Sequence, residues 1–367
     1  MKEEDHDRAQ RIAEALDGMV DVTAVYDSNR EIIVKGKLPG SIPPRPSEIG
    51  ARLREFGPDP VILSDGPWLV ARIRRQEKGR AGSFPRMNVL LFALTVLTTL
   101  ITGAFLERPD LITNTGILIK DPLGVMAAGL PFSISLMSIL LFHEFGHYLA
   151  ARFHGVDVSL PYFIPAPPGL SPFGTFGAFI KSKSPFLNRK QLLDVAAAGP
   201  LAGLIVAIVV MVIGISSSSV QSMPPDQGFV YFGESLLFRF MTYLVKGPIP
   251  DGSGLFISPV AFAGWVGILV TMFNLLPLGQ LDGGHIAYAL FGRYQTVIAH
   301  LFILALVVLS FFWFGWILWI FIGFLLRPAH PPTVLDELSV GGGRKLIGAL
   351  CILAFVLCFI PIPITMG

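Results

Sequence analysis

The 21 residues from Pro122 to Phe142 carry no charge, and they lead directly into the sequence HEFGH. About 20 consecutive apolar residues are what an α-helix needs to cross the roughly 30 Å hydrocarbon core of a bilayer. The whole chain shares this character, since 52% of its 367 residues are hydrophobic and only 15% are charged. Soluble domains average about 25% charged residues. The sequence therefore predicts an integral, multi-pass membrane protein, and its net charge of +2 gives no reason to expect a nucleic-acid partner.

Seven stretches are long or apolar enough to be transmembrane helices. They lie near 88–107, 130–153, 191–215, 258–276, 294–311, 313–326 and 345–361. The fifth and sixth are short and nearly continuous, so we expect a tight turn within residues 311–316. Six spans are the alternative to seven.

Lysine and arginine are concentrated in alternate loops, and this bias predicts the orientation. The basic residues before the first span are Arg72, Arg74, Arg75, Lys78, Arg80 and Arg86, against Glu77 as the single acid among them. Loops 154–190 and 327–345 are also basic, whereas loops 108–121 and 216–257 carry two basic residues each. The N-terminus is therefore expected on the cytoplasmic side.

Residues 1–80 are charged and patterned like a small soluble domain. Helices are expected at 7–18 and 47–56, and strands at 20–26, 30–38, 59–64 and 68–74. Turn residues follow the first strand at 27–29 and the third at 65–67. This order predicts an α+β sandwich of one sheet and two helices. Regulation, substrate presentation and a simple folded appendage are all open as its role.

The segment HEFGH places His143 and His147 four residues apart, so both imidazoles lie on one face of a helix. Glu144 is next to the first histidine, in the HExxH arrangement of two zinc ligands and a general base. A chance pair of histidines is the alternative, but ionisable groups within a membrane are costly and usually functional. The sequence therefore predicts a zinc site at the end of the second span.

A zinc site with one open position needs a third protein ligand. Asp282, in NLLPLGQLDGGH after the fourth span, is the strongest candidate, and Asp194 is the nearest competitor. Gly283 and Gly284 are expected to let the chain bend, so that the carboxylate turns back toward the membrane. Pro277 is expected to end or kink the preceding helix.

Depth in the membrane is a separate test of this ligand set. If the second span ends near Phe153, His147 lies about 9 Å and His143 about 15 Å from the cytoplasmic edge. Asp282 belongs to the cytoplasmic end of the fourth span under the predicted orientation. The three ligands are therefore expected on the same side and at similar depth.

These residues resemble the site-2 protease family of intramembrane zinc metalloproteases. HEFGH matches the family's HExxH motif, and Asn274, Pro277, Asp282 and Gly283 match its NxxPxxxxDG motif. The similarity extends through AAGPLAG (197–203) and GTFGAFI (174–180), and covers about residues 125–290, the family's three-helix catalytic core. The N-terminal domain and SLPYFIPAP (159–167) look like the branch with plant plastid members, so the cytoplasmic side is equivalent to the stroma there. Neither a PDZ nor a CBS domain is recognised.

The resemblance implies that His143, His147 and Asp282 bind one Zn²⁺ per chain and that Glu144 is the catalytic base. Asn274 would orient the substrate or stabilise the oxyanion, with capping of the broken helix end as an equal alternative. The family fold implies an all-α polytopic membrane protein of about seven helices, with a re-entrant β-like loop and the α+β domain. The expected domains are 1–80 and 88–363.

The loop 158–184 is rich in proline, glycine and aromatic residues and ends in the alternating GTFGAFIKSK. A transmembrane substrate must unwind locally before its peptide bonds become accessible, and a strand edge can bind an extended backbone. We therefore expect Gly174, Phe176 and Gly177 to contribute to a substrate clamp. A loop that only shields the site is the alternative.

The resulting interpretation is an intramembrane zinc metalloprotease that hydrolyses transmembrane protein substrates near the cytoplasmic side of the lipid bilayer. An ion or proton-coupled transporter is the first rival, and it predicts ionisable residues along a path through both leaflets. A catalytically silent member of the family that acts by binding is the second. The oligomeric state does not follow from the sequence.

Overall fold

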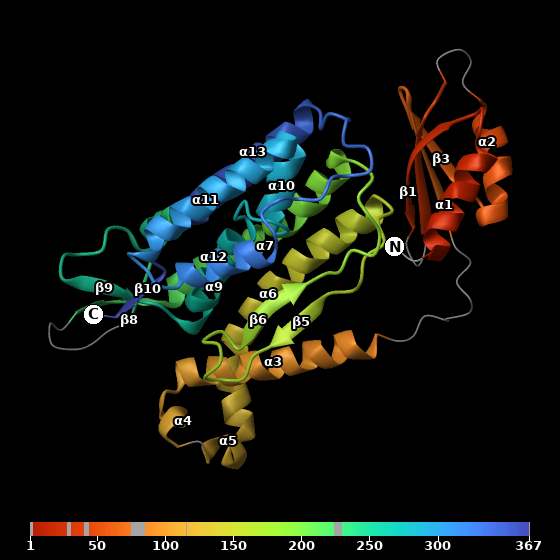
Figure 1. The fold of residues 1–367 in the computed structure, drawn as a ribbon. Coiled ribbons are helices and arrows are strands. Elements are labelled where there is room, and N and C mark those ends of the chain that lie inside the picture. The colour runs from red at the N-terminus through yellow and green to blue at the C-terminus, as the bar shows by residue number, and fades with distance from the viewer. Residues whose placement is uncertain are drawn as a thin grey trace. The chain divides into compact units, whose positions relative to one another are not determined.

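The computed structural model describes residues 3–27, 31–39, 44–74, 85–114, 116–223 and 230–366, and these form two compact units (Figure 1). The first unit contains the chain up to Phe84 together with Ser182–Asn188 and Thr333–Leu338. The second contains Pro85–Lys181, Arg189–Pro332 and Ser339–Gly367. Six residues used in the sequence-based predictions lie outside the described ranges, namely Ser28, Asn29, Arg75, Glu77, Lys78 and Arg80.

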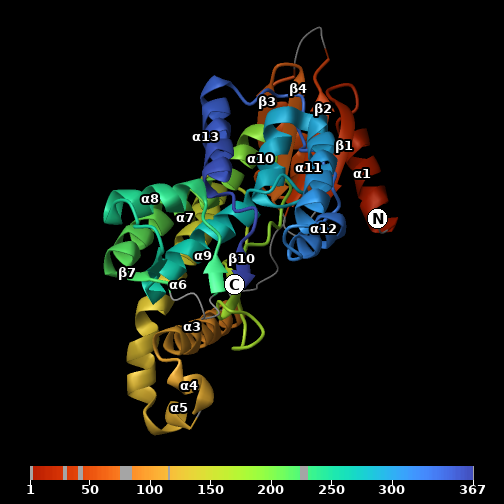
Figure 2. The same cartoon turned by 90° about the vertical axis from the view of Figure 1, so that its left-hand side faces the viewer.

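The first unit is built on a four-stranded antiparallel sheet in the order β1-β2-β4-β3, which can be followed in Figure 2. Its strands are β1 (Asp21–Asp27), β2 (Glu31–Lys37), β3 (Val61–Asp65) and β4 (Trp68–Arg74). Helices α1 (Glu3–Ala15) and α2 (Pro46–Leu53) pack on one face, where Ile12 and Leu16 meet Ile32 and Val34. All six predicted elements are present, with the first helix beginning earlier than expected.

Both faces of this sheet are covered. Because side chains alternate along a strand, Ile33 of β2 and Val70 of β4 point away from α1 and α2. They are buried by Leu187, Val334 and Leu335 from the two later segments of the same unit. Strand β2 is therefore buried on both faces at its centre, with Ile32 and Val34 toward the helices and Ile33 toward the two later segments.

The second unit is mostly helical. Its longer helices are α3 (Arg86–Glu107), α6 (Pro122–Phe153), α7 (Arg189–Ser217), α8 (Leu236–Lys246), α9 (Pro259–Asn274), α10 (Asp282–Phe291), α11 (Gln295–Ser310), α12 (Trp316–Leu325) and α13 (Gly342–Cys358), with the short α4 (Asp110–Thr113) and α5 (Ile117–Lys120). Within the described residues, four helical stretches are long and apolar enough to cross a membrane, namely α3, α6, α7 and the continuous Asp282–Ser310. Helices α9 and α12 are apolar but shorter.

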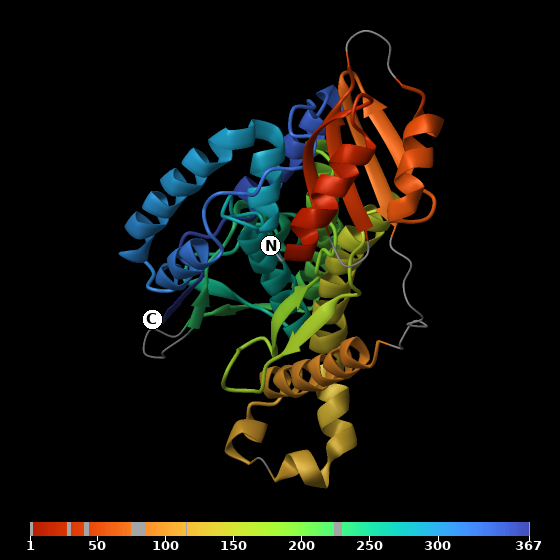
Figure 3. The ribbon, with the colours of Figure 1, turned by 45° about the vertical axis from the view of Figure 1, so that its right-hand side comes forward.

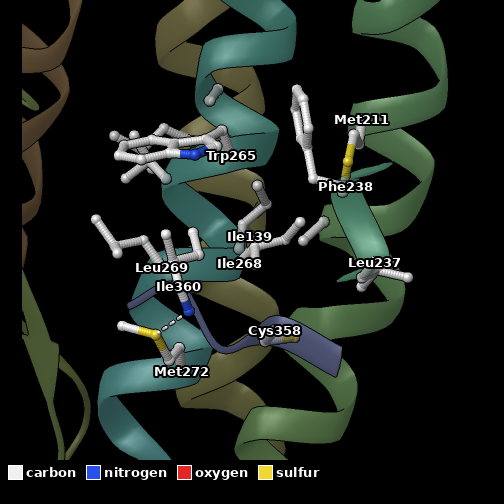
Figure 4. Packing of buried hydrophobic residues seen from close by; sticks show 14 of the residues in the cluster. Ile139, Met211, Leu237, Phe238, Trp265, Ile268, Leu269, Met272, Cys358 and Ile360 are labelled. Atoms are coloured by element: carbon white, nitrogen blue, oxygen red, sulfur yellow. Dashed lines mark hydrogen bonds between the residues drawn. The ribbon is translucent and has the colours of Figure 1, made fainter. Parts of the chain in front are cut away.

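The centre of this unit is the packing of α6, α7 and α9. Figure 4 shows Ile139 of α6, Met211 of α7 and Ile268 of α9 meeting in one cluster, beside the fully buried Trp265. Without a hydrophobic driving force between membrane helices, such contacts stabilise the bundle through close packing. After α13, the backbone N–H of Ile360 lies 3.1 Å from the Met272 sulfur.

Among the described residues, the second unit also contains three two-stranded sheets. The predicted strand-like loop forms a hairpin of β5 (Tyr162–Pro165) and β6 (Thr175–Phe179), in which β5 packs along α3 and β6 meets α6 (Figure 3). Two further pairs join β7 (Ser219–Ser222) to β9 (Ser253–Phe256) and β8 (Val230–Phe232) to β10 (Ile364–Met366). The sequence-based prediction does not contain these two sheets, because short polar-flanked strands give weak local signals. It does not contain α8 either.

Candidate metal centre

Helices α6 and α10 bring His143, His147 and Asp282 together. One ligand atom from each lies within 4.8 Å of the others. The two Nε2 atoms are 3.2 Å apart, and Asp282 Oδ2 lies 3.4 Å from His143 Nε2 and 3.2 Å from His147 Nε2. Both histidines are buried. The structure therefore joins the three residues that the sequence selects.

These separations fit a tetrahedral metal ion. Zinc bonds of about 2.0–2.1 Å to nitrogen and oxygen place neighbouring tetrahedral ligands roughly 3.3 Å apart. Two imidazole nitrogens and a carboxylate oxygen at this spacing, with one tetrahedral position open, match the donor set of catalytic zinc. The residues present therefore fit a single Zn²⁺.

The orientation of His147 is fixed from α7. Its Nδ1 lies 2.8 Å from the carbonyl oxygen of Val195, so Nδ1–H donates there and Nε2 is left with its lone pair facing Asp282. A hydrogen bond on the far nitrogen is the usual way a protein sets the tautomer of a metal-binding histidine. The sequence gives no signal for Val195, because only its backbone takes part.

Asp282 reaches the site at the first residue of α10. The chain turns at Pro277 and at Gly279, which has a φ of 49°. The expectation that Gly283 and Gly284 make the bend is wrong, since both lie within α10. A Cβ on Gly283 would overlap the Leu275 carbonyl, and one on Gly284 the Gly279 carbonyl. Both glycines are needed because the first turn of α10 packs closely against the chain before it, Gly283 against the end of α9 and Gly284 against the connecting loop.

Glu144 lies beside these three side chains, and one of its carboxylate oxygens makes no described hydrogen bond. Its Oε2 is buried and has no hydrogen-bond partner among the described residues. An orphaned buried carboxylate oxygen is costly and calls for a polar group that the protein itself does not supply. A water at the open metal position would meet that need.

A groove of about 500 Å³ leads to Glu144 and His143. Its other walls are β6, from Thr175 to Ala178, the inner face of α9, and the tryptophans Trp313 and Trp319. Asn274 also lines the groove, and its amide Nδ2 is 3.1 Å from His143 Nε2. Gly174, Phe176 and Gly177 are thus close to the groove, either as lining residues or, for Gly174, directly before β6.

Small residues let α7 pass directly behind the ligands. A Cβ on Gly199 would overlap the imidazole of His147, and one on Gly146 would come 2.5 Å from the Ala198 carbonyl oxygen. At Gly203 the added atom would lie 3.0 Å from His143 Cβ. The AAGPLAG sequence is therefore the surface on which the HEFGH helix rests.

The competing residues serve other contacts. Asp194 binds Arg344 through both carboxylate oxygens, at 2.8 and 2.9 Å, and accepts a hydrogen bond from His154 at 2.9 Å. This network joins α13 and the end of α6 to α7, and the sequence does not predict it because its members are far apart in the chain. His285 is paired with His330 at 2.6 Å.

Parts of this sequence are similar to known proteins. A family model described as "Peptidase family M50" matches residues 131–317. The chain is 32% identical over 292 residues to "Probable zinc metalloprotease EGY2, chloroplastic" from Oryza sativa subsp. indica, covering 74% of this chain and 50% of that protein. Its counterpart from Arabidopsis thaliana is 30% identical over 352 residues, 90% of this chain and 60% of that protein. "Probable zinc metalloprotease EGY1, chloroplastic" from Arabidopsis thaliana is 32% identical over 243 residues, 64% of this chain and 43% of that protein. The chain thus spans about half the length of these relatives.

Proposed function

The chain belongs to peptidase family M50, and from this premise we propose that it is an intramembrane zinc metalloprotease that hydrolyses transmembrane protein substrates. The observation that carries the proposal is the convergence of His143, His147 and Asp282 beside Glu144, whose buried Oε2 has no hydrogen-bond partner in the described part of the chain. This is the donor set and the base that metal-assisted peptide hydrolysis needs. The three residues are proposed as the ligands of one Zn²⁺.

Held by His143, His147 and Asp282, a zinc ion would supply Lewis acidity, which can lower the pKa of water to about 7. Glu144 accepts a proton at Oε2 as attack begins and later returns it to the leaving amine. The amide of Asn274 is aimed into the groove beside His143 and is proposed to donate a hydrogen bond to the developing oxyanion. Capping of the broken end of α9 is the alternative role of Asn274.

The β6 strand is proposed to clamp the substrate. It pairs with β5, and its residues line the groove that contains Glu144. A locally unwound substrate can add to such a strand through main-chain hydrogen bonds, while the apolar groove accepts its side chains. The apolar walls match a substrate drawn from a membrane helix.

Gly177→Ala tests the clamp. Gly177 has a φ of 96° and open space around an added Cβ, so alanine introduces only backbone strain, about 1–2 kcal/mol. We expect cleavage to fall several-fold without loss of zinc, because β6 must shift to relieve the strain. Gly169→Ala is the matched control, since Gly169 has a φ of 92° and equally open surroundings but lies outside β6. Equal cleavage by both variants would contradict the clamp.

The apolar helices support a membrane protein. We propose that the shorter α9 and α12 and the C-terminal α13 join the four long stretches as spans, giving about seven. The basic loops would then face the cytoplasm or an equivalent stromal side. Bond cleavage would take place near that side.

A transporter is less well supported by the site. Among the described residues, His143, His147 and Asp282 form the single group of three or more His, Cys, Asp and Glu side chains that could hold a metal. An ion path through both leaflets would require further ionisable groups along its length. The groove instead ends at one cluster.

Metal removal tests the proposed function. The purified chain, reconstituted with a labelled single-helix membrane peptide, is expected to contain one zinc per chain and to cleave the peptide. Chelation should abolish cleavage, and added zinc should restore it, because the base alone cannot activate water sufficiently at neutral pH. Cleavage that persists after complete removal of the metal would sink the proposal, and a zinc-loaded chain that never cleaves would favour the silent family member.

A further inference from the structure

We propose that the first unit is a positioning platform for the catalytic centre. Its sheet binds Ser182–Asn188 and Thr333–Leu338, and through these two segments it holds the helices that carry and orient the metal ligands. The inference rests on the proposed function and assigns a role to the N-terminal domain. The bound state of the segments is the active one.

The binding face is the side of the sheet that α1 and α2 leave uncovered. At its centre Ile33 is 1% and Val70 is 0% exposed, against Val334 at 1% and Leu335 at 6%. At its edge the Lys35 ammonium lies 3.0 Å from the Glu337 carboxylate and also stacks on the ring of Trp68. Burial this complete on both sides is typical of a specific interface rather than a chance contact.

The two segments also bind each other. The N–H of Val334 donates to the Phe186 carbonyl at 3.1 Å, and that of Leu335 donates to the Leu187 carbonyl at 2.6 Å. A parallel bridge between Asn188 and Leu335 continues this pairing. The sheet therefore holds two chain segments, far apart in sequence, as one strand-like pair.

The first segment, Ser182–Asn188, directly adjoins ordered structure at both ends. Before it, Lys181 is fixed to Ser159 by two hydrogen bonds of 2.9 Å at the end of the β5–β6 hairpin. After it, Arg189 begins α7. The second turn of α7 contains Val195, whose carbonyl orients His147. One bound segment thus lies between the proposed substrate strand and the helix that supports a ligand.

The second segment leads to the other ligand helix. Thr333 follows His330 after two prolines, which have fixed φ angles and make the connection stiff. His330 is hydrogen bonded to His285 at 2.6 Å, and its backbone N–H donates to Gln295 at 3.2 Å. His285 lies in the first turn of α10, which begins with Asp282. Both bound segments are therefore connected over a few residues to elements that orient or carry a proposed ligand, the first to α7 and the second, through His330, to α10.

If the sheet releases the two segments, the groups of the catalytic centre should be displaced. Displacement of reacting groups by about 1 Å can cost about 100-fold in rate. The metal would stay, because its three proposed ligands and the Val195 carbonyl that orients His147 all belong to the second unit. Reduced cleavage with unchanged zinc is therefore the expected signature.

Val334→Asp in the full-length, zinc-loaded chain tests the platform. A carboxylate at this buried position cannot be accommodated without release of the segment. We expect kcat/KM for the labelled membrane peptide to fall at least about tenfold, with zinc still at one per chain. The amides of Val334 and Leu335 should lose protection from hydrogen exchange. Val61→Asp is the matched control, because Val61 is 47% exposed on the edge strand β3 of the same unit.

The proposal is overturned if Val334→Asp releases both amides and still cleaves within about twofold of the wild type. A failure of the proposed function looks different, since the zinc-loaded wild type would then cleave no better than Glu144→Gln. If Val334→Asp lowers the helical circular dichroism of the chain, the variant has lost helical structure, and the Lys35–Glu337 ion pair provides the test instead. Glu337→Lys should then reduce cleavage, and adding Lys35→Glu should restore it. Equal cleavage by the wild type, Glu337→Lys and the double variant overturns the platform.

Discussion

Glu144→Gln is expected to keep one zinc per chain and to lower kcat by about 10²–10⁴-fold. Glutamine has the size and shape of glutamate, so the packing of α6 is retained, but its neutral amide cannot accept the proton of the attacking water. The buried Oε2 without a described partner is the atom that this proton would reach. Zinc content and single-turnover cleavage of the membrane peptide, measured on the same sample, give the result.

Glu107→Gln is the control for this change. Glu107 is exposed at the end of α3, so the same substitution there should leave both zinc and turnover unaltered. Wild-type cleavage by Glu144→Gln would refute its role as the base. A loss of zinc from Glu144→Gln would instead show that the carboxylate acts by retaining the metal.

Gly199→Ala is expected to reduce cleavage by about 100-fold and to weaken zinc retention, although residue 199 is not itself a ligand. The added Cβ would overlap the His147 imidazole, so either the ring rotates away from Asp282 or α6 and α7 move apart. The hydrogen bond from His147 Nδ1 to Val195 resists the first movement. Dialysis against a graded chelator series, followed by a cleavage assay, measures both effects.

Gly203→Ala is the comparison for Gly199→Ala, one turn further along α7. Its added Cβ would lie 3.0 Å from His143 Cβ and 3.2 Å from Nδ1, which a shift of a few tenths of an ångström relieves. We expect a much smaller loss of activity. If both alanines behave alike, the effect at Gly199 comes from general helix packing and not from the ligand.

Much of the architecture follows from local patterns. The alternating strands and two helices of the first unit are predicted from periodicity, and the break between α11 and α12 falls within the expected residues 311–316. Seven apolar stretches all contain helices. The four long stretches agree with a membrane protein, while α10 is missed as a separate helix because its short sequence DGGHIAYALF directly precedes another apolar run.

The site divides along a similar line. His143, His147 and Asp282 can be selected from the sequence because metal chemistry demands particular side chains at particular depths. The carbonyl of Val195 and the contacts of Asp194 cannot be selected this way, since one is a backbone atom and the other depends on an arginine from α13. The coverage of the β2–β4 face by residues 182–188 and 333–338 is equally unpredictable, because it depends on contacts between distant parts of the chain.

The ligands come from helices on opposite sides of the α7 segment in the chain, and this has a consequence for biogenesis. The ribosome makes His143 and His147 before Asp282, and α7 and α9 are made between them. A partly inserted chain therefore offers only a two-histidine half-site, too few donors to retain the ion. The complete set of proposed zinc ligands, and with it the proposed activity, would therefore form only after α10 is in place.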